Sequence, residues 1–196
     1  MNLTKILTYV FLVIAIGLAA YLVNLIYSDI ESKRRIAEIE ARVVEKLKMI
    51  RAAEIAYQAV HGQYTSDWDK LISFINDGKI YVVERREEII PLDYGADSLY
   101  VHVDTLDAVN VRDSLFSRTK YPDLIIEELP LIPESDKKFE IFADKITKSG
   151  VTVDVIEVRD IDPIDKTRKE DSEIKNRKPL RFGSRTEITT SGNWGE

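Results

Sequence analysis

The chain lacks cysteine altogether among its 196 residues. This absence excludes disulfide bonds, thiolate metal sites and cysteine nucleophiles, and it is compatible with either side of a membrane. Histidine is scarce as well, with two residues. We expect His61 at a helix end and His102 on the wet face of a strand, so both have structural or incidental roles rather than roles as metal ligands.

Recognisable catalytic motifs are also missing. The sequence contains no glycine-rich phosphate loop and no G-x-S-x-G elbow. Asp160, Asp162 and Asp165 resemble a calcium loop only in part, because the third acid is one position out of place and no glycine or closing glutamate follows. We therefore expect no enzymatic activity, no cofactor and no metal, with loose calcium binding at this loop as the minor alternative.

The chain has no excess of lysine and arginine over acidic residues, because its formal net charge is -6. A protein that binds nucleic acid needs a basic face to contact phosphates. We therefore expect no nucleic-acid partner.

Charge is absent from the segment between Ile6 and Ser28. As a helix this segment would reach ~34 Å, enough to cross the hydrocarbon core of a bilayer. A buried core helix would need a polar side, which the segment lacks. A cleavable signal peptide is the stronger alternative, but its apolar region runs only roughly 7 to 15 residues. We expect residues 1–28 to form a retained transmembrane helix.

Within this helix, Ala15 and Ala19 have the small-x-x-x-small spacing that lets two helices approach closely, and Asn24 could bond across helices. We predict that these three residues form a packing site for another helix in the membrane.

Residues 29–61 continue the helical pattern as an amphipathic stalk, without proline or glycine. The apolar stripe predicts a stalk interface formed by Ile36, Ile39, Val43, Leu47 and Ile50. One helix from about Lys5 to Val60 would be ~80 Å long, whereas a domain of the remaining size has a radius of gyration of only ~14 Å. We expect Ile50 to Val60 to pack on the chain's own domain and the preceding stripe to need another partner, such as a second copy in a coiled coil.

The stalk is predicted to end at a corner. Gly62 can adopt the left-handed conformation that closes a helix. Ser66 and Asp69 have the spacing of a capping box, and Trp68, Leu71, Ile72 and Ile75 form one apolar face of a short second helix.

The order of residues around this corner resembles that of type IV pilins and type II secretion pseudopilins. The matching residues are Ala56, Tyr57, Gly62, Tyr64 and Thr65, preceded by the apolar helix, and the likeness covers about the first 80 residues. The resemblance implies a small antiparallel sheet packed on the helix and a periplasmic domain. The span carries no acid where the family has a glutamate for assembly, so the resemblance implies a pilin-shaped membrane subunit rather than a pilus.

The flanking charges favour the opposite topology. Lys33, Arg34 and Arg35 follow the span, which by the positive-inside rule would place the domain in the cytoplasm. Because long domains translocate regardless of flanking charge, we follow the resemblance and expect a periplasmic domain.

Alternating patterns predict an α+β domain over residues 62–158, with strands at 79–84, 98–105, 123–129, 138–146 and 151–158. The alternation predicts one apolar strand face at Val151, Val153 and Val155, with the sheet's apolar side on the helix end. Residues 159–178 read as a solvated charged loop. The tail, residues 179–196, is either pinned to the domain, which we favour, or offered to a partner.

Together these patterns predict a single-pass structural subunit in a bacterial inner membrane. It would assemble through its helix with copies of itself or with other subunits of a secretion or pilus-like envelope machine. The alternative is a membrane-tethered periplasmic module that binds a ligand or a secreted client.

Overall fold

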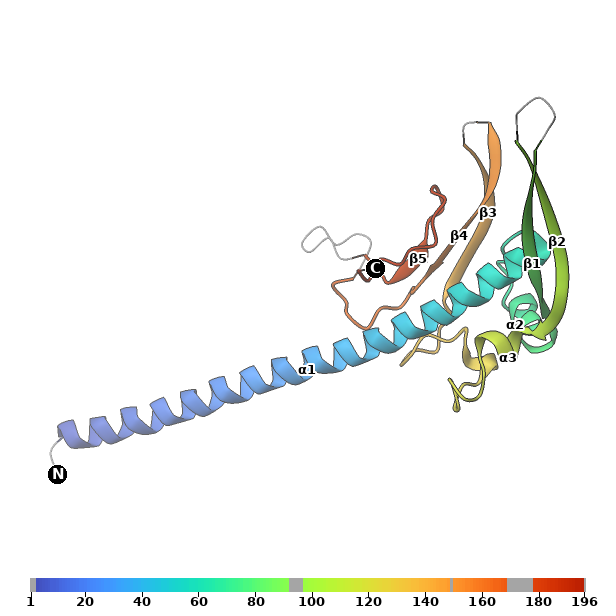
Figure 1. Ribbon diagram of the computed structural model, residues 1–196. Helices are drawn as coiled ribbons and strands as arrows, with labels where there is room; N and C mark the ends of the chain where they lie inside the picture. The colour runs from blue at the N-terminus through green and yellow to red at the C-terminus, as the bar shows by residue number, and fades with distance from the viewer. Residues whose placement is uncertain (1–2, 92–96, 149, 169–177, 196) are drawn as a thin grey trace.

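The computed structural model describes residues 3–91, 97–148, 150–168 and 178–195. At residues 3–6, 82–85, 87–91, 97–100 and 103–106 it describes the backbone alone. The architecture is α+β, as the sequence predicts: a long N-terminal helix, a short second helix and small antiparallel sheets. Half of the long helix projects from the rest of the molecule, which gathers around the other half and is here called the head (Figure 1).

The long helix α1 spans Leu3–His61 in one piece, confirming the predicted continuity. It ends where Gly62 takes a φ of 75° and its N–H donates to the carbonyl of Gln58 at 2.8 Å. A side chain is strained in this left-handed region, so glycine suits the corner.

The second helix α2, Trp68–Asp77, begins one residue later than the predicted cap implies. Asp67 is the N-cap, and its side chain accepts from the N–H of Asp69 at 3.0 Å. The predicted Ser66 and Asp69 capping box is therefore wrong. Thr65 contributes to the N-terminal end of α2 instead of Ser66, because its hydroxyl accepts a hydrogen bond from the N–H of Asp67.

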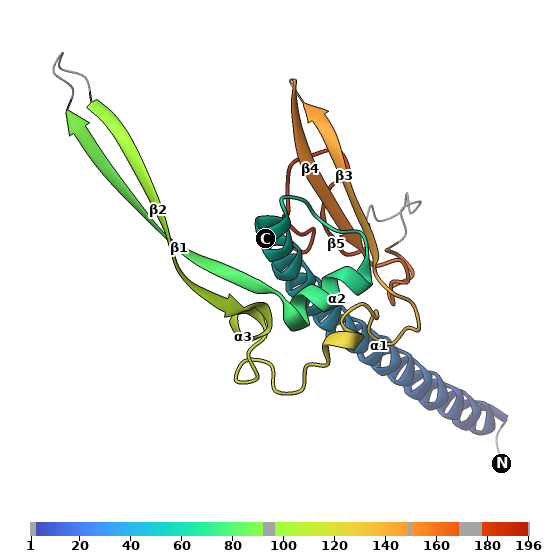
Figure 2. The same ribbon diagram turned by 90° about the vertical axis from the view of Figure 1, so that its right-hand side faces the viewer.

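The strands form two sheets rather than one. Strands β1, Lys79–Pro91, and β2, Asp97–Asn110, pair antiparallel with each other, and in the described chain with no other strand. Strands β3, Glu140–Lys148, β4, Val151–Arg159, and β5, Arg181–Gly183, form a second antiparallel sheet in that order. Figure 2 shows the β1–β2 hairpin and the three-stranded sheet diverging on either side of α1 and α2.

One predicted strand is wrong. Residues 123–129 form no strand and contain the 3₁₀ helix η1, Ile126–Glu128, while the short helix α3, Val111–Leu115, follows β2. Ile126 and Leu129 are both buried, and the N–H of Leu129 donates to the carbonyl of Ile126. Their spacing of three suits a 3₁₀ turn, in which residues i and i+3 share a face, and not the period of two of a strand.

The core side of β4 also differs from the prediction. Ile156 and Val158 join the hydrophobic core, whereas Val151 is exposed. From Val155 to Val158 both faces of the strand carry apolar residues, with Glu157 as the exception. The alternating pattern therefore could not indicate which face of β4 meets the core. Glu157 lies on the other face, where Arg181 and Arg185 donate to its carboxylate at 3.1 and 2.8 Å.

A single core joins α1 to the rest of the head. It contains Leu71, Phe74 and Ile75 of α2, and it includes buried residues from η1, β4 and β5. Trp68 ties α2 to the second sheet, because its Nε1 donates to the carbonyl of Phe139 at 3.2 Å. Only the base of the β1–β2 hairpin, at Ile80, packs against this core among the described side chains.

Candidate functional site

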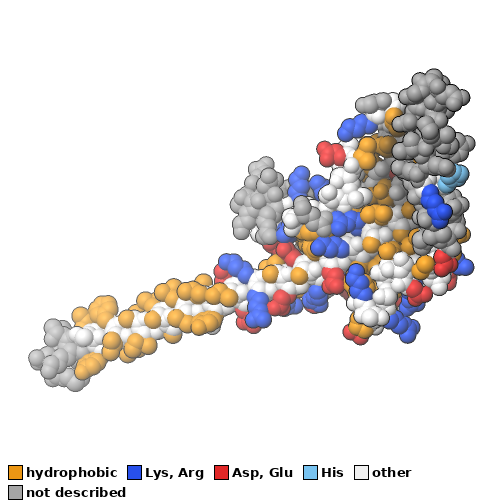
Figure 3. All heavy atoms as spheres, in the orientation of Figure 1, with side chains coloured by type: hydrophobic (Ala, Val, Ile, Leu, Met, Phe, Trp, Pro, Cys, Tyr) orange, Lys and Arg blue, Asp and Glu red, His pale blue; other side chains and the backbone are white. Residues whose placement is uncertain are grey.

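The strongest candidate site is the apolar half of α1. Its large side chains from Leu7 to Ile30 are all exposed, with Val13 at 68% of its full accessible area. Figure 3 shows this segment as a rod of hydrophobic side chains that leaves the charged surface of the head. The segment is ~36 Å long at 1.5 Å per residue, so it is long and apolar enough to cross a membrane. A signal sequence near the N-terminus has the same properties.

The three residues predicted to pack against a membrane partner lie on this rod, but not on one face. Ala15 and Ala19 are four residues apart and share a face of the helix. Asn24 lies nine residues after Ala15, about 180° around the helix axis, on the side of Gly17. All four residues are exposed. The rod thus offers a small-residue face and, opposite it, a face with glycine and a polar side chain.

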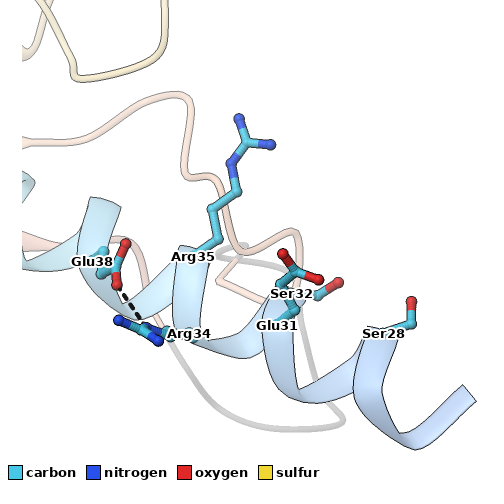
Figure 4. A pocket seen from close by; sticks show the side chains of 6 residues that line it. All are labelled: Ser28, Glu31, Ser32, Arg34, Arg35 and Glu38. Carbon is cyan, nitrogen blue, oxygen red and sulfur yellow. Dashed lines mark hydrogen bonds and ion pairs between the residues drawn. The ribbon is translucent and has the colours of Figure 1, made fainter. Parts of the chain in front are cut away.

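Charged side chains surround α1 where the rod meets the head. Lys33 pairs with Asp29 at 2.7 Å, and Arg34 pairs with Glu38 at 3.0 Å. Figure 4 shows the Arg34–Glu38 pair on one side of the helix and Arg35 pointing away from it. Arg35 approaches Glu134 of the head at 3.6 Å. Exposed pairs of this kind contribute little stability, so their main effect is to mark where α1 becomes hydrophilic.

The predicted stalk interface does not face a partner. Ile39, Val43, Leu47 and Ile50 are buried, with Ile39 at 1% and Leu47 at 0% of their full accessible areas. Ile36, one turn closer to the rod, is half-buried. The prediction that this stripe needs a partner outside the chain is therefore wrong.

The head reaches the stripe because it is elongated along α1 and is not a sphere. Lys46 donates to the carbonyls of Glu128 and Leu131 at 2.7 and 2.8 Å, which holds the η1 region against the helix. Arg42 pairs with Glu134 at 3.0 Å. The radius of gyration expected from the domain's size applies to a compact, nearly spherical shape. For an elongated head, it underestimates the length of helix that these segments cover.

The predicted packing of the helix end is confirmed for Ile50, Ala53 and Ala56, which belong to the core. Val60, in contrast, is exposed. The residues on which the resemblance to pilins rests lie at this end of α1 and at the corner beyond it. Tyr57 lies against His61, with ring centroids 4.3 Å apart, and against Phe74 at 5.2 Å.

Sequence reasoning missed Glu54, which lies at the same end of α1 with 0% of its area exposed. One carboxylate oxygen, Oε2, accepts from the N–H of Thr65 at 3.1 Å, and the other, Oε1, has no hydrogen-bond partner among the described residues. Burial raises the pKa of Glu54 to about 8, against a smaller lowering by the Thr65 hydrogen bond. The signal was available, because an acid stands between the buried Ala53 and Ala56 on an otherwise apolar side.

The described part of the charged loop, residues 159–168, makes contacts with α1 and with the head. Arg168 forms a bidentate pair with Glu40 of α1, one bond of which measures 3.0 Å. Asp160 is buried, which raises its pKa, whereas hydrogen bonds from Ser135 and Lys137 lower the pKa of Asp162. Residues 169–177 lie outside the described chain. In the described chain no group of three acids or histidines could hold a metal ion.

The tail is packed on the head, which confirms the alternative that we favour from the sequence. Phe182 is buried, Arg51 of α1 donates to the carbonyl of Thr190 at 3.3 Å, and the Arg51 guanidinium lies 5.6 Å from the centre of the Trp194 ring. The histidines, His61 and His102, are both exposed.

A projecting apolar helix on a small α+β head is thus the class of architecture that this chain defines. Comparison with known proteins finds no matching family model, no matching curated relative and no matching solved structure.

Proposed function

We propose that this protein is a single-pass, pilin-like structural subunit of a bacterial envelope assembly, with its rod in the inner membrane and its head on the periplasmic side. The observation that carries the proposal is the exposed apolar rod from Leu7 to Ile30. In water this surface would drive aggregation, so it requires either lipid or other apolar helices around it. The bacterial setting and the side of the membrane come from the resemblance to pilins.

The division of α1 into two halves supports the pilin-like part of the proposal. The resemblance implies a helix whose far end carries a small antiparallel sheet. In this chain the second half of α1 is embedded in such a head, and the residues that resemble pilins lie at its end. The proposed role is structural rather than enzymatic.

The rod is also the proposed assembly surface, in place of the stalk stripe, which the head covers. Ala15 and Ala19 together offer a face on which a second helix can approach closely. Lipid tails are as apolar as leucine, so close packing, and not hydrophobicity, must select this face over the others. Copies of this chain or other subunits of the same machine would pack there.

The test substitutes leucine for alanine and measures cross-linking between subunits in native membranes. Ala15→Leu with Ala19→Leu fills the small-residue face, and we expect cross-linked oligomers to be lost. Ala20→Leu is the matched control, because it makes the same chemical change about 100° around the helix from Ala19. Equal cross-linking in all variants would count against assembly through this face.

A second candidate is a membrane-tethered binding module for a ligand or secreted client. It is favoured by the β1–β2 hairpin, which stands away from the core on an anchored head (Figure 2). Capture of a client by the anchored protein, with normal capture by the Ala15→Leu, Ala19→Leu variant, would favour this candidate.

A further inference from the structure

A groove of about 510 Å³ lies where the end of α1 meets α2. Three aromatic side chains line it: Tyr57 and His61 of α1, and Phe74 of α2. His61 is the last residue of α1 and follows the end of the rod, Ile30, by ~46 Å along the helix at 1.5 Å per residue. The groove therefore lies at the end of α1 opposite to the rod, beside α2 (Figure 2).

The three rings, here called the aromatic cluster, are in contact with one another. The ring of His61 lies 4.3 Å from that of Tyr57 and 5.5 Å from that of Phe74, centre to centre. Phe74 is buried, Tyr57 is half-buried and His61 is exposed. The cluster thus reaches from the core to the surface, where the face of an aromatic ring attracts a cation.

Other aromatic rings of the head have a cation from the chain itself. The Lys120 ammonium lies 5.1 Å from the centre of the Tyr121 ring, and the Arg185 guanidinium lies 4.8 Å from that of Phe142. In the described chain no lysine or arginine lies over a ring of the aromatic cluster in this way. Its exposed surface is therefore accessible to a cation from another molecule.

Acidic side chains border the same groove. Asp69 and Asp77 of α2 line it, both are exposed, and neither carboxylate has an ion pair or hydrogen bond with a described residue. Asp77 is in the last turn of α2, where the partial negative charge of the helix end adds to its own and no basic residue compensates. Among the described residues, the cation that lines the groove is Lys70, which pairs with Asp67 at 3.9 Å.

We infer that this groove binds an arginine side chain presented by a partner protein. A guanidinium is planar, so it can stack on the exposed ring of His61 while its N–H groups donate to the carboxylate of Asp77. A lysine ammonium has the charge but neither the flat face nor the paired donors. The groove is on the head and far from the rod, so the inference does not depend on assembly through the rod.

Histidine labelling tests the site, because the chain has two histidines. The full chain in detergent micelles, with isotope-labelled histidine, gives NMR ring signals from His61 and from His102. His102 is paired with Arg86, ~23 Å along β1 from Lys79 at 3.3 Å per residue, so it serves as an internal control. The peptide acetyl-Gly-Arg-Gly-amide is titrated at one fixed pH, and we expect the His61 signals to shift and saturate while those of His102 stay in place.

Acetyl-Gly-citrulline-Gly-amide is the matched control peptide, because citrulline keeps the shape of arginine without its charge. We expect it to leave the His61 signals unchanged. The peptide with lysine in place of arginine should bind more weakly than the arginine peptide, and added salt should weaken both. No shift of His61 with the arginine peptide, an equal shift with the citrulline peptide, or equal shifts of both histidines would each overturn the inference.

Asp77→Asn tests the role of the carboxylate. It should raise the dissociation constant of the arginine peptide about two- to fivefold, the range for one exposed ion pair. It should not lower the melting temperature, because it removes a negative charge from the negative end of α2. Asp123→Asn makes the same change at an exposed position outside the groove and should have no effect. Equal dissociation constants for Asp77→Asn and the unmodified protein would show that the groove does not bind the guanidinium as inferred.

Two further variants complete the test. Lys70→Gln removes the cation that lines the groove, so it should lower the dissociation constant of the arginine peptide, and a higher one would contradict the inference. The Ala15→Leu, Ala19→Leu variant should bind the peptide as the unmodified protein does. A failure of rod packing and a failure of the groove are therefore distinguishable.

Discussion

At the residue scale, Glu54 is an acid that is fully buried, with 0% of its area exposed. Its carboxyl is enclosed at the corner of α1, and only Oε2 has a described partner, the N–H of Thr65. An ionised carboxylate there would lose its hydration without full compensation, which is why its pKa rises to about 8. Glu54 is therefore mostly protonated at neutral pH in the folded state.

This protonation makes stability depend on pH. Between the ordinary pKa of 4.5 and about 8, the unfolded chain loses the Glu54 proton while the folded chain keeps it. The free energy of unfolding must then fall as pH rises through this window and level off above it. We expect Glu54→Gln, which resembles the protonated acid, to remove this slope and to stabilise the protein at pH 8 by on the order of 3–5 kcal/mol.

Denaturant unfolding of both proteins between pH 5 and 9 measures the effect. Glu45→Gln, at an exposed position of the same helix, is the control and should retain the slope of the unmodified protein. A Glu54→Gln protein with an unchanged slope would show that the carboxyl is already ionised when folded.

At the element scale, α1 combines two different environments in one uninterrupted helix. From Leu7 to Ile30 its large apolar side chains are exposed, and from Ile39 onward one stripe enters the core. Lys46 illustrates how closely the head follows the helix: it is half-buried between two carbonyl acceptors, and desolvation lowers its pKa. The stalk is thus part of the head's own fold.

Leu47→Ala tests whether the head or a partner buries the stalk. Truncation of a fully buried leucine should lower the free energy of unfolding by about 2–5 kcal/mol. Ile55→Ala, at a position 44% exposed on the same helix, should lower it by less than about 1 kcal/mol. Because burial lies within one chain, the Leu47→Ala loss should be the same at all protein concentrations in detergent.

At the scale of the whole molecule, a hydrophobic rod and a charged head are joined with little transition. The pairs Lys33–Asp29 and Arg34–Glu38 begin within one turn of the end of the apolar segment. The first contact with the head follows at Arg35, which approaches Glu134 at 3.6 Å. If the rod lies in a bilayer, this contact is therefore about 8 Å along the helix from the end of the apolar segment, at 1.5 Å per residue.

Membrane insertion can be tested without disturbing the head. Leu18→Lys with Leu22→Lys places two charges near the middle of the rod, each disfavouring insertion by about 2.5–3.5 kcal/mol. We expect the double variant to dissociate from membranes on alkaline extraction, whereas Leu18→Ala with Leu22→Ala remains bound. Both leucines are exposed and far from the core, so the circular dichroism of the head should not change.

Local patterns predicted the elements that depend on local properties. The absence of charge between Ile6 and Ser28 indicated the rod, and the absence of glycine and proline from residues 29–61 indicated that the helix continues beyond it. Alternation predicted four of the strands, because a strand has its own period. It failed at Ile126, where proline on either side and a spacing of three favoured a 3₁₀ turn.

The sequence by itself determined where the helix runs, where it turns and where four of the strands lie, since backbone propensity and side-chain period act over a few residues. Only the tertiary structure decided what covers Leu47, which face of β4 meets the core, that the strands separate into two sheets and that Glu54 is enclosed. These outcomes depend on contacts between residues distant in the chain. Their free energy comes from packing the whole head, which no local pattern records.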